Sequence, residues 1–118
     1  MLSSKNSLAV LRKTNALLDG HFVLSSGLHS PSYVQCAKLL SFPHKAEKFT
    51  KSLASKIKKT FKNIDLILSP AMGGIVIGYE IGRILKKETI FCERVDGSFK
   101  LRRGFNIRKG SRVLIIED

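Results

Sequence analysis

The pattern of apolar and polar positions predicts a chain organised around residues 64–82. Leu66, Ile67 and Leu68 form a short continuous apolar run, which is typical of a strand buried on both faces of a parallel sheet. The run ends at Ser69-Pro70, and a glycine pair follows. Apolar residues at helical spacing then extend over 75–86. We therefore predict a strand, a glycine loop and a helix in succession.

The segment before this unit predicts two helices and a hairpin. Apolar spacing indicates an amphipathic helix over 4–18 and a second over 44–62, which we expect to cover one face of the sheet. Residues 21–24 and 32–36 have strand composition and enclose a turn at 25–31. His21 and His29 flank this turn, and without a carboxylate partner at recognisable spacing we interpret them as structural.

The segment after the central unit predicts two more buried strands, over 89–92 and 113–116. Between them, the glycine-bounded segment 93–104 is rich in cations and indicates a mobile loop or hairpin that closes over an anion. The whole pattern predicts an α/β fold with a parallel sheet flanked by helices. We expect one domain, with an N-terminal segment over 1–40 and a core over 44–118.

Glycines give the central loop two possible roles. Gly73 and Gly74 lack Cβ atoms, so backbone N–H groups at the start of a helix can approach a phosphate or pyrophosphate closely. A tight turn alone would explain the pair equally well. Gly74, Gly78 and Gly82 recur every fourth residue, and we expect this stripe to let the helix lie close to the sheet.

The net charge indicates that binding partners are anionic, but it does not identify them. A formal net charge of +12 on 118 residues predicts attraction to nucleic acid, acidic lipid or a polyphosphate metabolite. Seven lysines lie in the helix predicted over 44–62, where we interpret them as a solvated face, because the exposed aromatics and arginines of a nucleic-acid surface are lacking. We expect no membrane span, because the uncharged run 66–79 is too short.

The remaining signals are weaker. Cys36 and Cys92 are too few for a disulfide framework or a zinc site, so we expect reduced, structural thiols in strands. The N-terminus lacks the apolar core of a signal peptide, which indicates a cytoplasmic protein. Glu117 and Asp118 follow the last predicted strand, where ligands bind in open parallel sheets, and should face the same crevice as 70–74. Such a pair could hold a metal, take a proton or accept hydrogen bonds from sugar hydroxyls.

Three segments together resemble the orotate phosphoribosyltransferases of the type I phosphoribosyltransferase superfamily. They are Gly20-His21-Phe22-Val23-Leu24-Ser25-Ser26-Gly27-Leu28-His29-Ser30, Pro70-Ala71-Met72-Gly73-Gly74, and Leu101-Arg102-Arg103-Gly104-Phe105 running on to Val113-Leu114-Ile115-Ile116-Glu117-Asp118. Their order and spacing match the family over nearly the whole chain. The resemblance implies transfer of ribose 5-phosphate from phosphoribosyl pyrophosphate to orotate, with Mg2+, in UMP and pyrimidine biosynthesis.

The resemblance also assigns roles to residues. Ala71, Met72, Gly73 and Gly74 would bind pyrophosphate, and Glu117 and Asp118 would contact the ribose hydroxyls. Ser25, Ser26, Gly27, Tyr33 and Val34 would belong to a hood over the orotate ring. Arg94 and Lys100, with Arg102 and Arg103 in reserve, would stabilise the leaving pyrophosphate from a loop that closes over a neighbouring subunit of a homodimer. The magnesium would arrive with the substrate, with no direct protein ligand.

Departures from the family pattern limit this expectation. Many relatives carry Tyr-Lys where this chain has Met72-Gly73, and Lys100 is the sole lysine in the predicted catalytic loop. The family continues past the position of Asp118 with a 5′-phosphate loop, so we expect an N-terminal, truncated part of a longer enzyme that is inactive alone. Two alternatives stay open: a non-catalytic phosphoribosyltransferase-like regulator that binds nucleic acid, and a structural remnant with exposed apolar surface.

Overall fold

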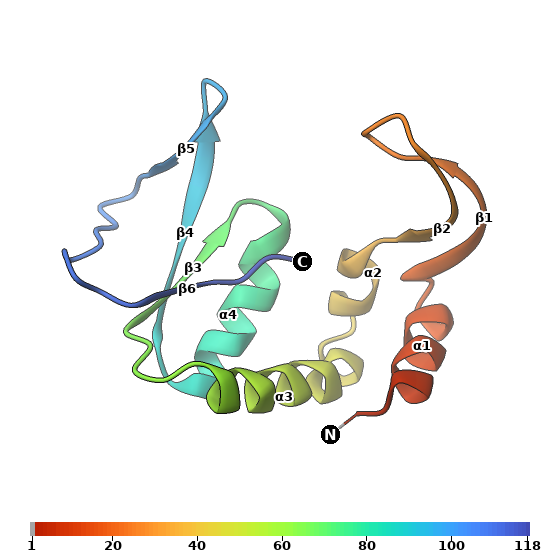
Figure 1. Ribbon diagram of the computed structural model, residues 1–118, viewed down its shortest axis with the longest axis horizontal. Helices are drawn as coiled ribbons and strands as arrows, with labels where there is room; N and C mark the ends of the chain where they lie inside the picture. The colour runs from red at the N-terminus through yellow and green to blue at the C-terminus, as the bar shows by residue number, and fades with distance from the viewer. Residues whose placement is uncertain (1) are drawn as a thin grey trace. The chain divides into compact units, whose positions relative to one another are not determined.

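The computed structural model describes residues 2–118, which divide into two compact units between Phe49 and Thr50. The first unit contains a short α1, a two-stranded hairpin, α2 and the beginning of α3 (Figure 1). The bounds of these elements are α1 Ser4–Lys13, β1 Leu17–Val23, β2 His29–Val34, α2 Cys36–Leu40 and α3 Pro43–Thr60.

The first helix ends earlier than the sequence predicted. Leu17 and Leu18 were expected to continue the helix, but they begin β1 and pair with Val34 and Tyr33 of β2. Asn15 takes a left-handed conformation with φ of 58°, which ends the helix, and Ala16 is then fully buried. An apolar pair after an amphipathic stretch fits the end of a helix as well as the start of a strand, so the sequence pattern did not distinguish the two.

Helix α2 is an element that the sequence pattern did not reveal. Cys36 was predicted to end a strand, yet it begins this helix, whose first turn is capped by Gln35: the Gln35 side chain accepts from the Ala37 N–H at 3.4 Å. Five residues are too few to display helical periodicity. Leu39 of α2 packs with Ala16 and Ala46 in the small core of this unit, together with four partly buried residues, Val10, Leu11, Leu40 and Phe49.

The second unit contains the rest of α3, a four-stranded mixed sheet and a helix, α4, that packs on the sheet (Figure 1). Its elements are β3 Leu66–Pro70, α4 Gly73–Leu85, β4 Glu88–Val95, β5 Ser98–Leu101 and β6 Val113–Ile115. The strand order is β5-β4-β3-β6: β3 pairs in parallel with β4 and β6, and β5 is antiparallel to β4. The segment expected to be a mobile loop or hairpin is therefore a hairpin, formed by the end of β4 and by β5.

The stripe of glycines on α4 lets this helix touch the sheet. A Cβ atom built on Gly78 would overlap the Ser69 hydroxyl, and one built on Gly82 would overlap that of Thr89. The helix backbone therefore lies directly on β3 and on the start of β4, as predicted. Ile67, Ile81 and Ile90 are the largest fully buried apolar side chains around this contact.

Strand β6 differs from the expectation of a fully buried strand. It lies at the edge of the sheet, and Ile115 is 67% exposed. Ile116, the last residue of the predicted strand, lies beyond β6 but is buried, and its N–H donates to Leu68 O at 3.0 Å. A continuous apolar run does not distinguish a central strand from an edge strand.

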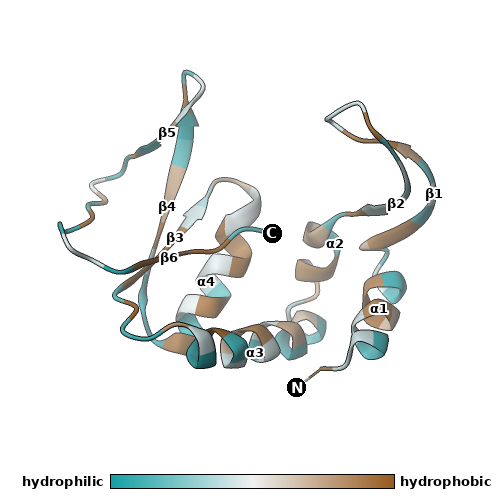
Figure 2. Ribbon diagram, in the orientation of Figure 1, coloured by the Kyte–Doolittle hydropathy of each residue, from teal (hydrophilic) through white to brown (hydrophobic). Residues whose placement is uncertain are grey.

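Hydropathy follows the division between sheet and hairpin. In Figure 2, β6 carries hydrophobic colours and the arrowhead of β3 is pale, while β4 has a hydrophobic middle followed by a hydrophilic stretch toward β5. The sheet is thus buried where β4 lies beside β3, and polar where β4 leaves it. No helix within residues 2–118 combines the length and the apolar character that crossing a membrane requires.

Candidate functional site at the carboxyl ends of the strands

A short loop joins β3 to α4 at the carboxyl end of the sheet. We call Ala71, Met72, Gly73 and Gly74 the anion loop. The Ala71 N–H donates to Cys92 O of β4 at 2.8 Å, and the Ala71-Met72 peptide bond is cis. Met72 is 85% exposed and occupies the N-cap position of α4 without giving a side-chain hydrogen bond. Since the first turn also has no acidic residue, no side chain of this turn caps the amide groups at the start of the helix.

The anion loop touches the residues that follow β6. A Cβ atom on Gly73 would lie 2.5 Å from Asp118 Oδ1, and one on Gly74 would lie 2.9 Å from Ile116 O and 3.1 Å from Glu117 Oε1. The two glycines therefore face the paired acids at van der Waals distance. The structure thus brings together two segments, 71–74 and 117–118, that the sequence placed at one crevice.

The paired acids are exposed at this edge of the sheet. Glu117 Oε1 accepts from the Asp118 N–H at 3.0 Å, which turns the Glu117 carboxylate back onto the chain. Among residues 2–118 there is no group of three or more His, Cys, Asp and Glu side chains arranged to hold a metal ion. The chemistry available at this point is that of two carboxylates beside a helix N-terminus.

Four cations expected at the site lie on or just after the β4–β5 hairpin. Pro70 pairs with Cys92, so β4 continues three residues past the end of β3 and carries the hairpin beyond the anion loop's strand. Arg94 donates to Gly97 O at 3.2 Å and stacks over the Phe99 ring at 4.4 Å. Neither Lys100 nor Arg102 makes a side-chain hydrogen bond or ion pair with another residue in the described part of the chain.

Arg103 has a different environment from the other three cations. Its Nε and Nη2 atoms donate to the two oxygens of Glu93, each at 3.0 Å. Hydrogen bonding from Arg103 lowers the pKa of Glu93 below its ordinary value, against the opposing effect of burial, and the same bonds raise the pKa of Arg103. Sequence reasoning missed Glu93, because it lies ten positions before Arg103 and the two residues come into contact only after the chain reverses.

The residues expected in the orotate hood all lie on the β1–β2 hairpin, but at its two ends. Ser25, Ser26 and Gly27 form the turn, where the Leu24 and Leu28 backbones are hydrogen bonded at 2.8 Å and Gly27 has φ of 84°. Tyr33 and Val34 end β2, at the opposite end of the hairpin. Five residues, 28–32, separate the two groups, and four of them belong to the extended strand β2.

Aromatic and imidazole contacts order the hairpin between these ends. The Tyr33 ring packs against Phe22 with centroids 5.6 Å apart. His21 Nε2 and His29 Nδ1 are 2.6 Å apart, so the two histidines bond to each other across the strands. This mutual bond agrees with their interpretation as structural residues.

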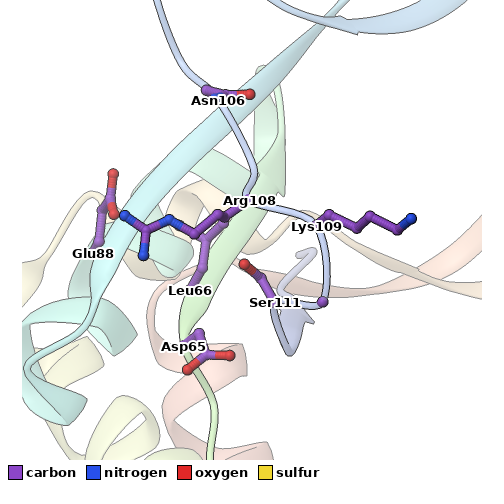
Figure 3. Close-up of a pocket in the computed structure, with 8 residues that line it drawn as sticks. Asp65, Leu66, Glu88, Asn106, Arg108, Lys109 and Ser111 are labelled. Atoms are coloured by element: carbon purple, nitrogen blue, oxygen red, sulfur yellow. The ribbon is translucent and has the colours of Figure 1, made fainter.

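A hollow of about 620 Å³ lies at the amino ends of the strands in the second unit's sheet, away from the anion loop (Figure 3). Its lining comes from the amino ends of β3 and β4 and from the loop before β6: Asp65, Leu66, Glu88, Asn106, Arg108, Lys109, Gly110 and Ser111. Figure 3 shows Arg108 and Lys109 extending in different directions from that loop, so their charges do not converge on one point. Asp65 has a structural role, because its Oδ2 accepts a hydrogen bond from the Arg112 N–H at 2.8 Å.

The parallel strands, the glycine-striped helix and the acids beside the anion loop define the class of the chain, the type I phosphoribosyltransferase fold. Solved structures show the same fold. An orotate phosphoribosyltransferase from Francisella tularensis aligns over 100% of this chain and 57% of its own, with a TM-score of 0.69 and 22% identity. An adenine phosphoribosyltransferase from Trypanosoma brucei aligns over 100% and 57%, with a TM-score of 0.63 and 17% identity. At these identities the likeness establishes the fold alone.

Sequence relatives narrow the class: over nearly its whole length the chain is similar to curated orotate phosphoribosyltransferases. It is 48% identical over 118 residues to the orotate phosphoribosyltransferase of Erythrobacter litoralis, covering 99% of this chain and 61% of that protein. It is 52% identical over 112 residues to that of Sphingopyxis alaskensis, covering 94% and 57%. The chain therefore spans about three fifths of the length of these curated relatives. No protein-family model matches it.

Proposed function

We propose that this chain provides the pyrophosphate-binding loop, the ribose-contacting acids and the hood of an orotate phosphoribosyltransferase. The reaction would transfer ribose 5-phosphate from phosphoribosyl pyrophosphate to orotate and release pyrophosphate. One observation carries the proposal: the glycines of the anion loop lie against Glu117 and Asp118, so a single ligand can meet amide donors and carboxylate acceptors together. In phosphoribosyl pyrophosphate, the diphosphate would accept hydrogen bonds from the amide donors, and the ribose hydroxyls would donate to the carboxylates.

The electrostatics of the site suit this reaction. Charge builds on the leaving pyrophosphate as its bond to the ribose breaks, and donors that already face this charge stabilise the transition state. The amide groups at the start of α4 provide such donors, because no side chain of their own turn caps them. Lys100 and Arg94 on the hairpin would add cationic charge, and Arg102 is a further uncommitted cation.

Magnesium enters this proposal with the substrate. Two adjacent carboxylates are hard oxygen donors that suit Mg2+, but they are fewer than a dedicated protein cage would offer. This donor set fits an ion that takes most of its ligands from the diphosphate and from water. When bound, the ion would neutralise the diphosphate, while the anion loop orients it and Glu117 and Asp118 hold the ribose hydroxyls.

The hood is the basis for proposing orotate as the acceptor base. The T. brucei relative in fold acts on adenine, as its name states, so the core fold does not select the base. The β1–β2 hairpin carries the orotate-type residues of the resemblance, with Ser25, Ser26 and Gly27 in its turn and Tyr33 beside Phe22. Assembly as a homodimer, which the resemblance implies, and a cytoplasmic location belong to the same proposal.

The test is orotate consumption, followed by its ultraviolet absorbance after addition of phosphoribosyl pyrophosphate and magnesium. The 118-residue chain is compared with a version extended at Asp118 by the segment that its curated relatives have. We expect the extended version to consume orotate, and adenine, hypoxanthine and uracil to compete poorly.

Two results would separate the alternatives. If the extended version uses adenine or uracil in place of orotate, the fold assignment holds and the proposed acceptor is wrong. If no base is consumed and the chain binds RNA or DNA with strong salt dependence, the regulator alternative replaces the enzyme.

A further inference from the structure

The base of the β4–β5 hairpin is closed by a contact that the proposed reaction does not itself require. After β5 ends at Leu101 the chain reverses: the Phe105 N–H donates to Arg102 O at 3.0 Å, and Arg103 and Gly104 have φ of 59° and 73°. Glycine adopts this left-handed conformation freely, but for arginine it is sterically unfavourable. A non-glycine residue keeps such a conformation where its surroundings hold it.

The surroundings of Arg103 do hold it. Its guanidinium group donates to both Glu93 oxygens at 3.0 Å, a bidentate geometry that fixes the plane of the group as well as its position. The Glu93 side chain is only 19% exposed, although Arg103 is 60% exposed. Because lysine lacks the planar fork, this contact is specific to arginine.

Aromatic packing reinforces the ion pair. The Arg103 guanidinium lies over the Phe91 ring at 5.5 Å, and Phe105 meets the same ring edge to face at 5.3 Å. Residues 103–105 are therefore held against residues 91–93 of β4 by three contacts. We call this group, Phe91, Glu93, Arg103 and Phe105, the latch.

The latch contains the carboxylate that lies opposite Lys100. In the antiparallel pairing of β4 and β5, Lys100 lies directly opposite Glu93. Opposite charges at such positions normally attract each other. Within residues 2–118, however, Glu93 forms its ion pair with Arg103, and Lys100 forms none. Arg103 thus occupies the carboxylate that would otherwise bind Lys100.

We propose that Glu93 and Arg103 are positioning residues: their pair fixes the base of the hairpin and keeps Lys100 uncommitted, so that its ammonium group is available to an anionic ligand. This inference rests on the proposed function, in which that ligand is pyrophosphate. It also reassigns Arg103, which the sequence placed in reserve as a catalytic cation, to holding the hairpin rather than touching the substrate.

The test uses the 118-residue chain with magnesium pyrophosphate as the probe, and measures two independent properties. Hydrogen exchange of the hairpin amides, 96–104, reports the latch, and calorimetric titration reports pyrophosphate binding. We expect Arg103→Gln to accelerate hairpin exchange by about three- to tenfold and to weaken pyrophosphate binding by a similar factor, because Lys100 then pairs with Glu93.

A rescue distinguishes this inference from simple loss of a cation. The double variant Glu93→Gln/Arg103→Gln should exchange as fast as Arg103→Gln, yet recover most of the pyrophosphate affinity, because Lys100 has no carboxylate to bind. Arg103→Lys should keep the charge but still accelerate exchange. Two controls match the changes in charge: Arg108→Gln at the opposite edge of the sheet, and Glu80→Gln, which removes the bidentate pair with Arg83 on α4.

The outcomes are separable. Unchanged hairpin exchange in Arg103→Gln would overturn the latch, whatever happens to binding. A double variant that binds as weakly as Arg103→Gln would overturn the role assigned to Lys100. A wild-type chain that binds no pyrophosphate, but whose hairpin loosens in Arg103→Gln, would confirm the latch and overturn the proposed function.

Discussion

Gly73 faces the carboxylate of Asp118 so closely that a Cβ atom on this residue would lie 2.5 Å from Asp118 Oδ1. The two residues belong to segments 45 positions apart (118 − 73) that meet only because β3 and β6 are neighbours in the sheet. While the carboxylate keeps this position, the contact leaves no room for a side chain between the anion loop and the acid. What can enter is a ligand that replaces the carboxylate or bonds to it.

Gly73→Ala and Gly74→Ala form a matched pair of changes with different expected costs. At Gly73 the obstructing atoms belong to an exposed carboxylate that can swing away, so stability should change by less than about 0.5 kcal/mol. At Gly74 they are the Ile116 carbonyl and the Pro70 ring, each 2.9 Å away and fixed in the fold. We expect Gly74→Ala to destabilise the chain by about 1–3 kcal/mol.

Urea unfolding of the two variants measures this difference. Each variant is compared with the wild-type chain at the same concentration. Equal losses in the two variants would mean that the contacts at Pro70 and Ile116 relax as easily as a surface carboxylate.

Ser69→Ala should leave stability unchanged or raise it by up to about 1 kcal/mol. Ser69 is 1% exposed, and its hydroxyl has no hydrogen-bond partner in the described chain. Removing a buried hydroxyl without a partner removes its desolvation penalty. Thermal unfolding followed by circular dichroism gives the sign of the change, and a clear loss of stability would imply a partner for the hydroxyl.

The same hydroxyl obstructs Gly78, which predicts a coupling. Gly78→Ala should cost less in a Ser69→Ala background, because one of the two overlapping atoms is gone, although Ser69 Cβ would still lie 3.0 Å from the new methyl group. Gly82→Ala, obstructed by Thr89, serves as the control and should cost the same in both backgrounds. Additive costs at Gly78 and Ser69 would contradict the direct contact.

Acid should release the latch. A carboxyl group whose folded pKa is lowered contributes stability at pH above its unfolded pKa, and loses it as the pH falls through the folded value. Glu93 has this direction of shift, from an ordinary value of 4.5, because Arg103 bonds to its charged form. Hairpin protection should therefore be constant from neutral pH down to about pH 5 and decrease below the ordinary glutamate pKa.

Hydrogen exchange corrected for its intrinsic pH dependence checks this expectation. Glu93→Gln should show no such acid transition in the hairpin. Glu80, whose pKa is lowered by Arg83, should retain its own transition in that variant, since it lies on α4. An acid transition that persists unchanged in Glu93→Gln would assign it to another group.

Ile115→Lys should reduce self-association without a large loss of stability. Ile115 is 67% exposed on the edge strand β6, and an exposed apolar strand edge favours pairing with another chain. A lysine at an edge position opposes such pairing by charge and desolvation. Sedimentation velocity over a range of concentrations measures the effect, and equal association of both proteins would exclude this edge as the contact.

Sequence reasoning was reliable where a pattern is local. The continuous apolar run of β3, the glycine pair and the helical spacing of α4 each show their structure within a few residues, and the four-residue glycine period correctly predicted close helix packing. The strand-end rule then placed Glu117 and Asp118 beside the anion loop. Their binding roles, like those of the cations and the hood residues, stay predictions.

The errors arose where the deciding contact is distant or the element is short. Leu17 and Leu18 fit a helix until β2 pairs with them, and the five residues of α2 are too few for any period. The exposure of Ile115 follows from the edge position of β6, which the apolar run itself does not indicate. Arg103 and Glu93 meet only after β5 has reversed the chain. The sequence therefore did not show that one arginine of the basic cluster forms an ion pair within the hairpin.

Cys92 connects the two parts of the site through one peptide unit. Its carbonyl oxygen accepts the Ala71 N–H of the anion loop, and it pairs across the hairpin with Leu101, next to Lys100. A hairpin that tilts toward a bound ligand must move this residue, and with it the loop amide that the carbonyl holds. We therefore expect a spectroscopic label on the anion loop to detect a ligand that binds at the hairpin, and a label on the hairpin to detect a ligand that binds at the loop.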